Sequence, residues 1–316
     1  MVLNRTGDSL THKKFSDIVD SFVPGDVLVM NDSKVFPCRL ITTRKSGGRQ
    51  EIFLIREVDP SNQTWEVLLN ANLKVKAGDQ FNFDGLRVTM TNDAQPDNAT
   101  RVAKLEFDGD LFPLLQKIAH IPLPPYITRP DTPEDITTYQ TVYAKNTGSV
   151  AAPTAGFHFT QDLLDTLRSK GVIITTVTLH VGPGTFLPVR TENIQDHKMH
   201  TEFYSLSADT CHIINEAKKQ NRRVSAVGTT SVRVLESAAA NKTALTPHNG
   251  QTAIFIYPPY NFKIVDRLIT NFHQPESTLL MLVSAFAGRK KILAAYQEAI
   301  SLGYRLFSYG DALLIE

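Results

Sequence analysis

Short apolar runs alternate with polar turns along most of this chain. Residues 26–30, DVLVM, form an apolar run directly after Pro24 and Gly25 and predict a buried strand. Four later runs, EIFLIREV, TWEVLLN, FNFDGLRVTM and TRVAKLEF, are rich in β-branched or aromatic residues and are separated by turn residues. This spacing predicts a small antiparallel β-barrel.

Beyond about residue 131 the pattern changes to alternating helices and strands. QDLLDTLRSKG predicts a helix with Thr160 as its N-cap and Gly171 beyond its end, and VIITTVTLHV predicts the strand that follows. SADTCHIINEAKKQ predicts a further helix and RRVSAV a further strand, while STLLMLVSAFAG and KKILAAYQEAI have helical spacing. The alternation indicates an α/β layered architecture.

The predicted all-β block lies between two stretches of α/β character, which favours an insertion over a terminal domain. We therefore predict a discontinuous α/β domain at residues 1–37 and 131–316 that carries most of the active site. The inserted β-barrel domain is placed at residues 38–130. The proline-rich segment IPLPPYITRP, which ends at Pro130, is expected to be extended rather than helical.

Composition and charge narrow the class of protein only slightly. The 316 residues are 42% hydrophobic, and 33 Lys and Arg against 32 Asp and Glu give a net charge of +1, which neither indicates nor excludes a nucleic-acid partner. Cys38 and Cys211 have no metal or redox spacing and are expected to be small buried side chains, as suits a reducing cytoplasm. Without a signal-like segment or a long apolar run, the sequence predicts a cytoplasmic protein that does not enter a membrane.

Residues 148–160, GSVAAPTAGFHFT, combine many small side chains with a histidine between two aromatic rings. Pro153 prevents a regular helix through this run. So much accessible backbone suggests a wall against which a flat ring or a sugar can lie, with His158 presented at its end.

A second candidate site is the segment RRVSAVGTTSVRVLES, in which a strand passes through Gly228 into a helix. Unpaired N–H groups at the helix start, beside the hydroxyls of Thr229 and Thr230, would make a site for a carboxylate or a phosphate. An ordinary N-cap by either threonine explains the pattern equally well. Arg233 and Glu236 lie three residues apart on this helix, and a surface ion pair would explain them too.

Two further loops concentrate polar groups next to predicted strands. TLHVGPGTFLPV places His180 at a strand end and brings Gly182 and Gly184 around Pro183, although His180 is also explained as a core histidine. LITNFHQPESTLL places Asn271 and His273 in a loop between a strand and a helix.

A metal site could be drawn from the sequence HKMHTE. His197, His200 and Glu202, together with His180, offer suitable ligand types, but their spacing is not that of a metal-binding helix and no Cys or Asp completes the set. A metal-dependent hydrolase is therefore a minor alternative, and no metal ligand is assigned.

Motifs spread along nearly the whole chain resemble one family. NDSKVFPCRL, PLPPYI, YQTVYAKNTGSVAAPTAGFHFT, TLHVGPGTFLPV, HKMHTEFY, VGTTSVRVLES, LITNFHQPESTLLMLVSAFAG and YRLFSYGDALLI are similar to the S-adenosylmethionine:tRNA ribosyltransferase-isomerases of queuosine biosynthesis. The resemblance implies an α/β domain that carries an inserted β-barrel, in agreement with the boundaries drawn from the pattern. Gln274 replaces a leucine usual in the family, and Lys34 stands where arginine is frequent.

The resemblance also implies a reaction. The ribosyl part of S-adenosylmethionine would be transferred to 7-aminomethyl-7-deazaguanine at the wobble position of tRNA and isomerised, giving epoxyqueuosine, adenine and methionine. S-adenosylmethionine would be a consumed substrate, so no cofactor is expected, and the tRNA would be the only macromolecular partner of a monomeric enzyme.

Candidate residues follow from this reaction, which needs acids and bases, a carboxylate site and a binding surface for RNA. The expected acid and base groups and their carboxylate partners are His158, His180, His273, Asp32 and Asp311. The expected substrate-binding residues are Phe157, Phe159, Gly182, Gly184, Gly228, Thr229, Thr230, Arg233, Glu236 and Asn271. Gly228, Thr229 and Thr230 are assigned to the methionine carboxylate, and the two phenylalanines to adenine or the sulfonium. Lys34 and Arg39 are expected to contact tRNA.

The position of Met1 leaves an alternative open. The chain starts where the first strand of the resembling family is already under way, so a truncated start is expected. A relative that binds tRNA or S-adenosylmethionine with impaired catalysis therefore stays an alternative.

Overall fold

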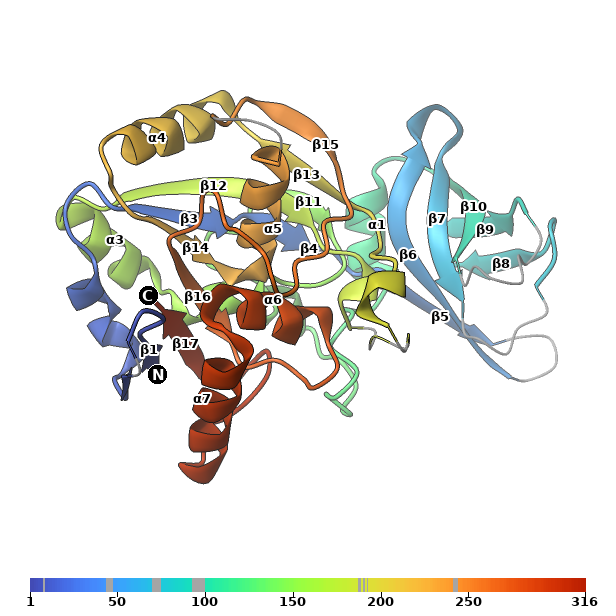
Figure 1. Ribbon diagram of the computed structural model, residues 1–316. Coiled ribbons are helices and arrows are strands. Elements are labelled where there is room, and N and C mark those ends of the chain that lie inside the picture. The colour runs from blue at the N-terminus through green and yellow to red at the C-terminus, as the bar shows by residue number, and fades with distance from the viewer. Residues whose placement is uncertain are drawn as a thin grey trace. The chain divides into compact units, whose positions relative to one another are not determined.

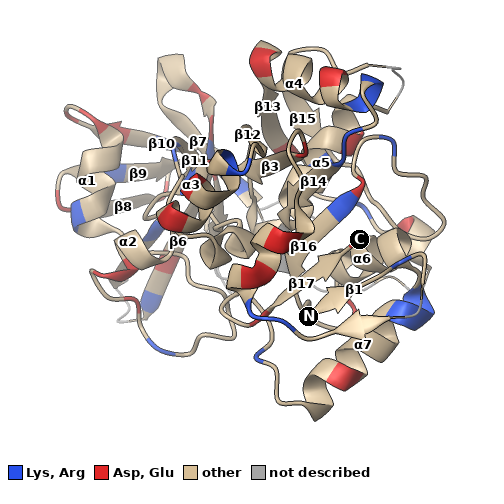
Figure 2. Cartoon of the chain, turned by 90° about the vertical axis from the view of Figure 1, so that its left-hand side faces the viewer, with Lys and Arg blue, Asp and Glu red and all other residues tan. Residues whose placement is uncertain are grey.

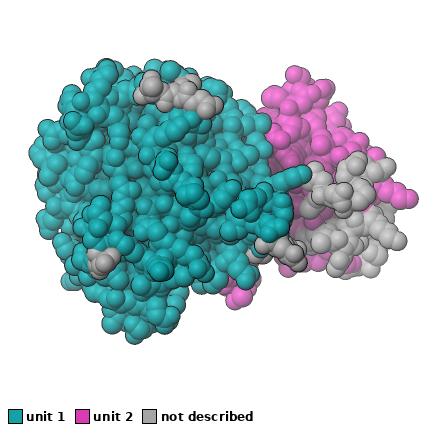
Figure 3. All heavy atoms as spheres, viewed as in Figure 1, with its two compact units in different colours: residues 1–34, 140–146, 152–316 teal, residues 35–139, 147–151 magenta. Residues whose placement is uncertain are grey.

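The chain forms two compact units in a computed structural model. The described residues are 1–7, 9–43, 48–69, 75–92, 100–186, 189, 191, 193–240 and 244–316. Unit 1 comprises residues 1–34, 140–146 and 152–316, and unit 2 comprises residues 35–139 and 147–151, as coloured in Figure 3.

Unit 1 is built on one large sheet, which has nine strands among the described residues (Figure 1). Their order is β15 (His248–Thr252), β13 (Glu202–Leu206), β12 (Ile173–His180), β3 (Val27–Asn31), β14 (Val224–Val227), β16 (Arg267–Asn271), β17 (Ala312–Ile315), β1 (Val2–Leu3) and β2 (Leu10–Thr11). The four neighbours β12, β3, β14 and β16 run parallel. Their carboxyl ends therefore meet along one edge of the sheet.

Helical segments cover both faces of this sheet. One face packs against α4 (Ala208–Lys219), α5 (Gly228–Ala238), α6 (Thr278–Ala287) and α7 (Arg289–Ser301), and the other against η1 (Phe15–Ser21), η3 (Thr154–His158) and α3 (Gln161–Ser169). The central strand β3 serves both layers, because Val27 and Val29 join the first core and Leu28 and Met30 the second. This alternation is the period of two expected for a strand buried on both faces.

Unit 2 contains a six-stranded antiparallel sheet. Its order is β5 (Arg39–Thr43), β6 (Arg49–Asp59), β7 (Thr64–Leu69), β10 (Thr100–Phe107), β9 (Leu86–Met90) and β8 (Gln80–Phe83). The two end strands β5 and β8 come into contact, so the sheet is nearly closed. Alternate side chains such as Leu54, Val67 and Leu105 fill its interior and are fully buried.

The remaining elements are short. β4 (Ser33–Val35) and β11 (Asn146–Ser149) form a separate two-stranded sheet. The other segments are η2 (Pro60–Asn62), α1 (Leu111–Ile118), α2 (Asp135–Thr138), η4 (Pro183–Phe186) and η5 (Ile194–Asp196). Among the residues that the structure describes, no helix is both long enough and apolar enough to cross a membrane.

The predicted fold class, an α/β domain with an inserted small antiparallel β-barrel, is confirmed. The Thr160 hydroxyl caps α3 by accepting from the Leu163 amide at 3.2 Å, and Cys38 and Cys211 are buried and form no disulfide with a described residue, both as predicted. The unit boundaries differ from the predicted ones, because residues 35–37, 131–139 and 147–151 belong to the smaller unit. Helix α1 was missed inside the block read as all-β, although its Pro113 lies in the first turn, where proline is compatible with a helix.

Candidate active site

Four sequence-predicted positions come together at the carboxyl edge of the parallel strands. Asp32 follows β3, His180 ends β12, Gly228 follows β14 and Asn271 ends β16. The strands are direct neighbours in the order β12, β3, β14 and β16. Since adjacent strands lie about 4.8 Å apart, these four residues span roughly 15 Å along one edge.

Asp32 is held in a buried polar cluster. Its Oδ1 accepts hydrogen bonds from Thr178 Oγ1 at 2.6 Å and from Asn146 Nδ2 at 3.0 Å. Burial lowers the pKa of the nearby His180, and the negative charge of Asp32 opposes that shift. The buried His180 Nδ1 has no hydrogen-bond partner among the described residues. A neutral imidazole beside a carboxylate is suited to accepting a proton.

His158 lies at the end of η3 and is oriented by Asn271. The Asn271 Nδ2 amide donates to His158 Nε2 at 3.1 Å, while Asn271 Oδ1 accepts from Thr154 Oγ1 at 3.1 Å. Nε2 must then be unprotonated, so the neutral ring carries its proton on Nδ1. Burial lowers the pKa of His158, with the Asp311 carboxylate opposing, which agrees with a neutral ring.

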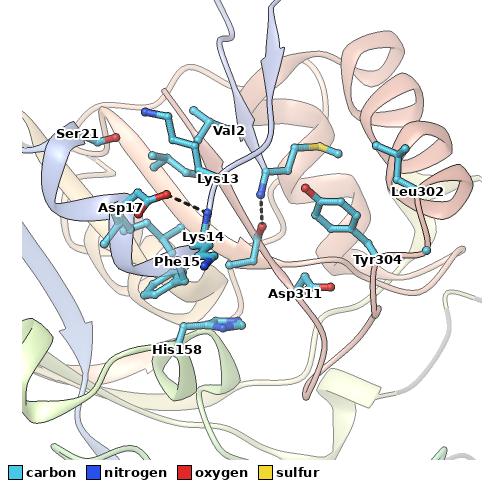
Figure 4. A pocket seen from close by; sticks show the side chains of 16 residues that line it. Val2, Lys13, Lys14, Phe15, Asp17, Ser21, His158, Leu302, Tyr304 and Asp311 are labelled. Carbon is cyan, nitrogen blue, oxygen red and sulfur yellow. Dashed lines mark hydrogen bonds between the residues drawn. The ribbon is translucent and has the colours of Figure 1, made fainter.

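A pocket of about 520 Å³ within unit 1 contains His158 (Figure 4). The His158 ring packs against η1 at the wall of this pocket, because its centroid is 5.0 Å from that of Phe15. Asp311 and Tyr304 line the same pocket. Asp311 is fixed by the Arg305 amide, which donates to its Oδ2 at 2.7 Å. The structure thus brings together His158 and Asp311, as the sequence suggested.

The small-residue run before His158 lets the chain pass close to its neighbours. A Cβ on Gly156 would overlap Tyr143 Oη and would lie 2.7 Å from Thr141 Cγ2. Ala155 in turn lies against Gly228, whose φ of +80° is a conformation that favours glycine. The run therefore packs the first turn of η3 directly against the start of α5.

The start of α5 has the features of an anion site. Its N-cap residue is Val227, which has no capping side chain, so the predicted alternative of a threonine N-cap is not observed. Thr229 and Thr230 are buried, and Thr230 Oγ1 has no hydrogen-bond partner in the described part of the chain. Free N–H groups and a free hydroxyl at one helix start favour a carboxylate or a phosphate.

Arg233 and Glu202 form a buried ion pair on the α5 side of the sheet. Arg233 is 5% and Glu202 4% exposed, and Arg233 Nη1 donates to Glu202 Oε2. Glu202 Oε1 also accepts from the Gly182 amide at 2.9 Å. The sequence allowed an ion pair between Arg233 and Glu236. This pair is not formed, because each of these side chains has a different partner.

Three predicted site residues lie apart from the carboxyl-edge cluster, which comprises Asp32, His158, His180, Asn271 and the start of α5. They are Glu236, His273 and Phe159. Both Glu236 oxygens accept from backbone amides of residues 263–265, at 2.9 to 3.1 Å. His273 Nε2 lies 2.9 Å from Thr270 Oγ1 on the opposite face from Asn271, and burial lowers the pKa of His273 to about 4. Phe159 is 1% exposed and packs edge-on against Phe15 in the core, so its ring does not flank a pocket. Substrate contacts by these three residues have no support in the geometry.

The remaining predicted site residues lie in different surroundings from one another. Phe157 is half-buried and its ring centroid is 5.5 Å from that of Tyr309. A Cβ on Gly184 would lie 2.6 Å from His200 Cγ, so this glycine makes room for the histidine ring. Lys34 is exposed on β4. Arg39 donates through Nε and Nη2 to both oxygens of Glu51, at 2.7 and 3.3 Å, which neutralises the charge expected to contact tRNA.

The metal-binding alternative has no support in the described residues, where no group of three or more His, Cys, Asp or Glu side chains is placed to hold a metal ion. Glu202 is occupied by Arg233 and Gly182. His197 instead stacks edge-on against Phe255 at 5.2 Å between centroids. The three residues of HKMHTE therefore have other contacts.

Sequence reasoning missed several residues of the site. Thr178 and Asn146 donate hydrogen bonds to Asp32, and Glu202 pairs with Arg233, yet only Glu202 was considered, as a metal ligand. Tyr304 was also missed, although its hydroxyl lies 2.7 Å from His12 Nδ1 and its ring lines the pocket of His158. The strand alternation in IITTVTLH could have indicated that Thr178 and His180 share a face.

Comparison with known proteins identifies the family. The family model described as "Queuosine biosynthesis protein" matches residues 1–315. The chain belongs to the queuosine biosynthesis protein family. Members of this family from Pelobacter propionicus and Halothermothrix orenii, both named S-adenosylmethionine:tRNA ribosyltransferase-isomerase, are 47% and 49% identical over the whole chain and 92% of their own length.

A solved structure agrees with this assignment to the queuosine biosynthesis protein family. The S-adenosylmethionine tRNA ribosyltransferase of Thermotoga maritima is 34% identical and matches with a TM-score of 0.54. The match covers 100% of this chain and 91% of the solved one. The two proteins thus share a fold over nearly their whole length.

Proposed function

We propose that this chain is an S-adenosylmethionine:tRNA ribosyltransferase-isomerase. It transfers the ribosyl moiety of S-adenosylmethionine to 7-aminomethyl-7-deazaguanine at the tRNA wobble position and isomerises it, giving epoxyqueuosine-tRNA, adenine and methionine. The observation that carries this proposal is the family match over residues 1–315, together with relatives of that name at 47% and 49% identity. The carboxyl-edge cluster supplies the acid, base and anion sites that the reaction needs.

The substrates follow from the reaction. S-adenosylmethionine is consumed rather than used as a methyl donor, so the enzyme needs no separate cofactor, and it acts as a monomer in the cytoplasm. The tRNA must present its wobble base outside the anticodon stack, as other base-modifying enzymes require. Because contacts to the RNA backbone release counterions, tRNA affinity should fall steeply as the salt concentration rises.

Three tasks can be assigned to residues of the cluster. A base must remove a proton next to the positive sulfur, and His180 suits this role because its Nδ1 has no hydrogen-bond partner among the described residues and Asp32 would stabilise the imidazolium that forms. His158, neutral and fixed by Asn271, is placed to hold a proton on Nδ1 for the departing adenine. The start of α5 is assigned to the methionine carboxylate, since the Thr230 hydroxyl there has no hydrogen-bond partner within the described ranges.

The direct test measures adenine released from S-adenosylmethionine in the presence of tRNA that carries the deazaguanine base. The wild-type chain should release adenine, and His180→Gln should reduce turnover by about a hundredfold or more. His212→Gln, an exposed histidine on α4, is the matched control and should retain full turnover. No adenine above the background without enzyme, from folded protein, would contradict the proposed function and favour the binding-only alternative.

A further inference from the structure

A second pocket of unit 1 lies at the opposite edge of the sheet from the candidate active site. Its volume is about 810 Å³, and its lining includes residues that directly precede or begin the parallel strands: Arg223 before β14 and Arg267 at the start of β16. Val23, four residues before β3, lines it too. Because the active-site residues follow the carboxyl ends of these strands, the proposed reaction does not account for this pocket. Lys13 and Ser21 line both this pocket and that of His158.

The lining of this pocket is rich in positive charge. Its basic side chains are Arg5, Lys13, Lys218, Arg222, Arg223 and Arg267, and its acidic ones are Asp20, Asp266 and Glu316. Figure 2 shows the basic positions of the chain in blue and the acidic ones in red. With six basic side chains against three carboxylates, the pocket attracts anions.

Several of these cations are not neutralised. Lys218 pairs with Asp266 at 2.8 Å, and Arg223 pairs with the buried Asp26 at 2.7 Å. In contrast, the side-chain cations of Arg5, Lys13 and Arg222 form no salt bridge with a described residue. The Arg5 guanidinium lies 4.5 Å from the centroid of the Phe286 ring. Arg222 is exposed, and its guanidinium lies against the loop at Gly25.

Arg267 is a buried cation with unused donors. It is 2% exposed, its Nη1 donates to Ser21 O at 2.6 Å, and its plane stacks on Phe22 at 4.5 Å. The nearest carboxylates, on Asp26 and Glu316, are 3.8 Å away, and Nε and Nη2 have no hydrogen-bond partner among the described residues. Burial, and then the charge of Arg223, lower the pKa of Arg267 to about 10. A negative ligand in the pocket would offset this local excess of positive charge.

We propose that this pocket binds a phosphate group, held by the exposed Arg222, by the half-buried Arg5 and by the field of the buried Arg267. Guanidinium groups match phosphate oxygens in pairs, and a dianion suits an excess of several positive charges better than a carboxylate does. The phosphate can belong to the backbone of the tRNA or to a small phosphate compound.

The first experiment measures binding of inorganic pyrophosphate by isothermal titration calorimetry. Arg222→Gln should weaken binding about tenfold, and Arg222→Glu should abolish it. Lys219→Gln is the matched control, because this exposed lysine lies three residues away, pairs with Glu216 and does not line the pocket. Circular dichroism melting curves of the variants should match that of the wild type.

The second experiment measures the affinity of fluorescently labelled tRNA against salt concentration by anisotropy. If the phosphate belongs to the RNA backbone, Arg222→Gln should weaken tRNA binding about three- to tenfold and reduce the slope of log affinity against log salt by about one. If the pocket binds a small phosphate compound instead, Arg222→Gln should weaken pyrophosphate binding and leave tRNA binding unchanged. The proposal is overturned if neither affinity changes, or if Lys219→Gln changes both to the same extent. Neither readout depends on adenine release.

Discussion

The Nδ2 amide of Asn271 donates to Nε2 of His158 at 3.1 Å, which joins a strand end to a histidine 113 residues away. This bond fixes both the orientation of the ring and the nitrogen that carries the proton. Asn271 is therefore a positioning residue for His158 rather than a contact to substrate alone.

Asn271→Asp should disturb this arrangement without changing the shape of the site. A carboxylate in place of the amide favours a proton on His158 Nε2, so the pKa of His158 should rise. We expect turnover to fall about tenfold or more and the His158 signal in an NMR titration to move to higher pH. Asn193→Asp, on the surface, is the control. An unchanged His158 titration would contradict the role given to Asn271.

Asp32→Asn tests the cluster beside His180. The substitution keeps an oxygen for Thr178 and Asn146 but removes the charge that holds up the pKa of His180. Turnover should fall about a hundredfold, and the acidic limb of the pH–rate profile should move to lower pH. Asp108→Asn, on the surface of unit 2, should leave both unchanged. A loss of turnover with an unmoved profile would indicate a purely structural role for Asp32.

Removing one partner of the buried pair between Arg233 and Glu202 should destabilise the protein. A single change, Arg233→Met or Glu202→Gln, leaves an unpaired group in the interior and should cost about 3 to 5 kcal/mol in the free energy of unfolding. The double variant should recover part of this loss, since neither charge then remains. Urea unfolding measures all three variants, and a loss in the double variant equal to the sum of the two single losses would show that the two side chains are not coupled.

His273 should make stability depend on pH. Its pKa of about 4 in the folded state lies below the value of 6.5 for a free histidine, so between these values the unfolded chain binds the extra proton. Stability should therefore fall by about 2 kcal/mol as the pH drops from 6.5 to 4. His273→Gln should reduce this slope, whereas the exposed His212→Gln should not. If the wild type and both variants show the same slope of stability against pH, His273 does not cause the pH dependence.

Gly156→Ala tests the close packing of the small-residue run. The added methyl group would overlap Tyr143 Oη, so we expect a loss of about 1 to 3 kcal/mol in the free energy of unfolding. Gly48→Ala is the control, because a Cβ there meets nothing within 4 Å. Adding Tyr143→Phe should partly restore the stability of Gly156→Ala, and no such rescue would mean that another contact limits the site.

Local pattern was enough to predict the elements that carry the site. From the sequence, His180 was placed at a strand end, and Gly228 and Asn271 were placed between a strand and a helix. Parallel strands bring such positions to one edge of the sheet. The side chains that pair with Arg233 and Asp32 could not be predicted, because tertiary packing brings Glu202 to Arg233, and Asn146 is 114 residues from Asp32 in the sequence. The alternation of side chains along a strand also could not show that the chain turns after Asn271 and places His273 on the other face of the sheet.

The position of β3 between β12 and β14 in the interior of the large sheet has a consequence during synthesis of the chain. Its neighbours β12 and β14 begin at Ile173 and Val224, whereas all six barrel strands lie before Leu111. At the usual rate of about 5 to 20 residues per second, roughly 7 to 30 seconds separate the emergence of β3 from that of β12. An apolar strand without its neighbours is a site for aggregation. The barrel strands can pair on the ribosome while the first central strand still awaits its partners, which makes this interval the vulnerable stage in the production of the protein.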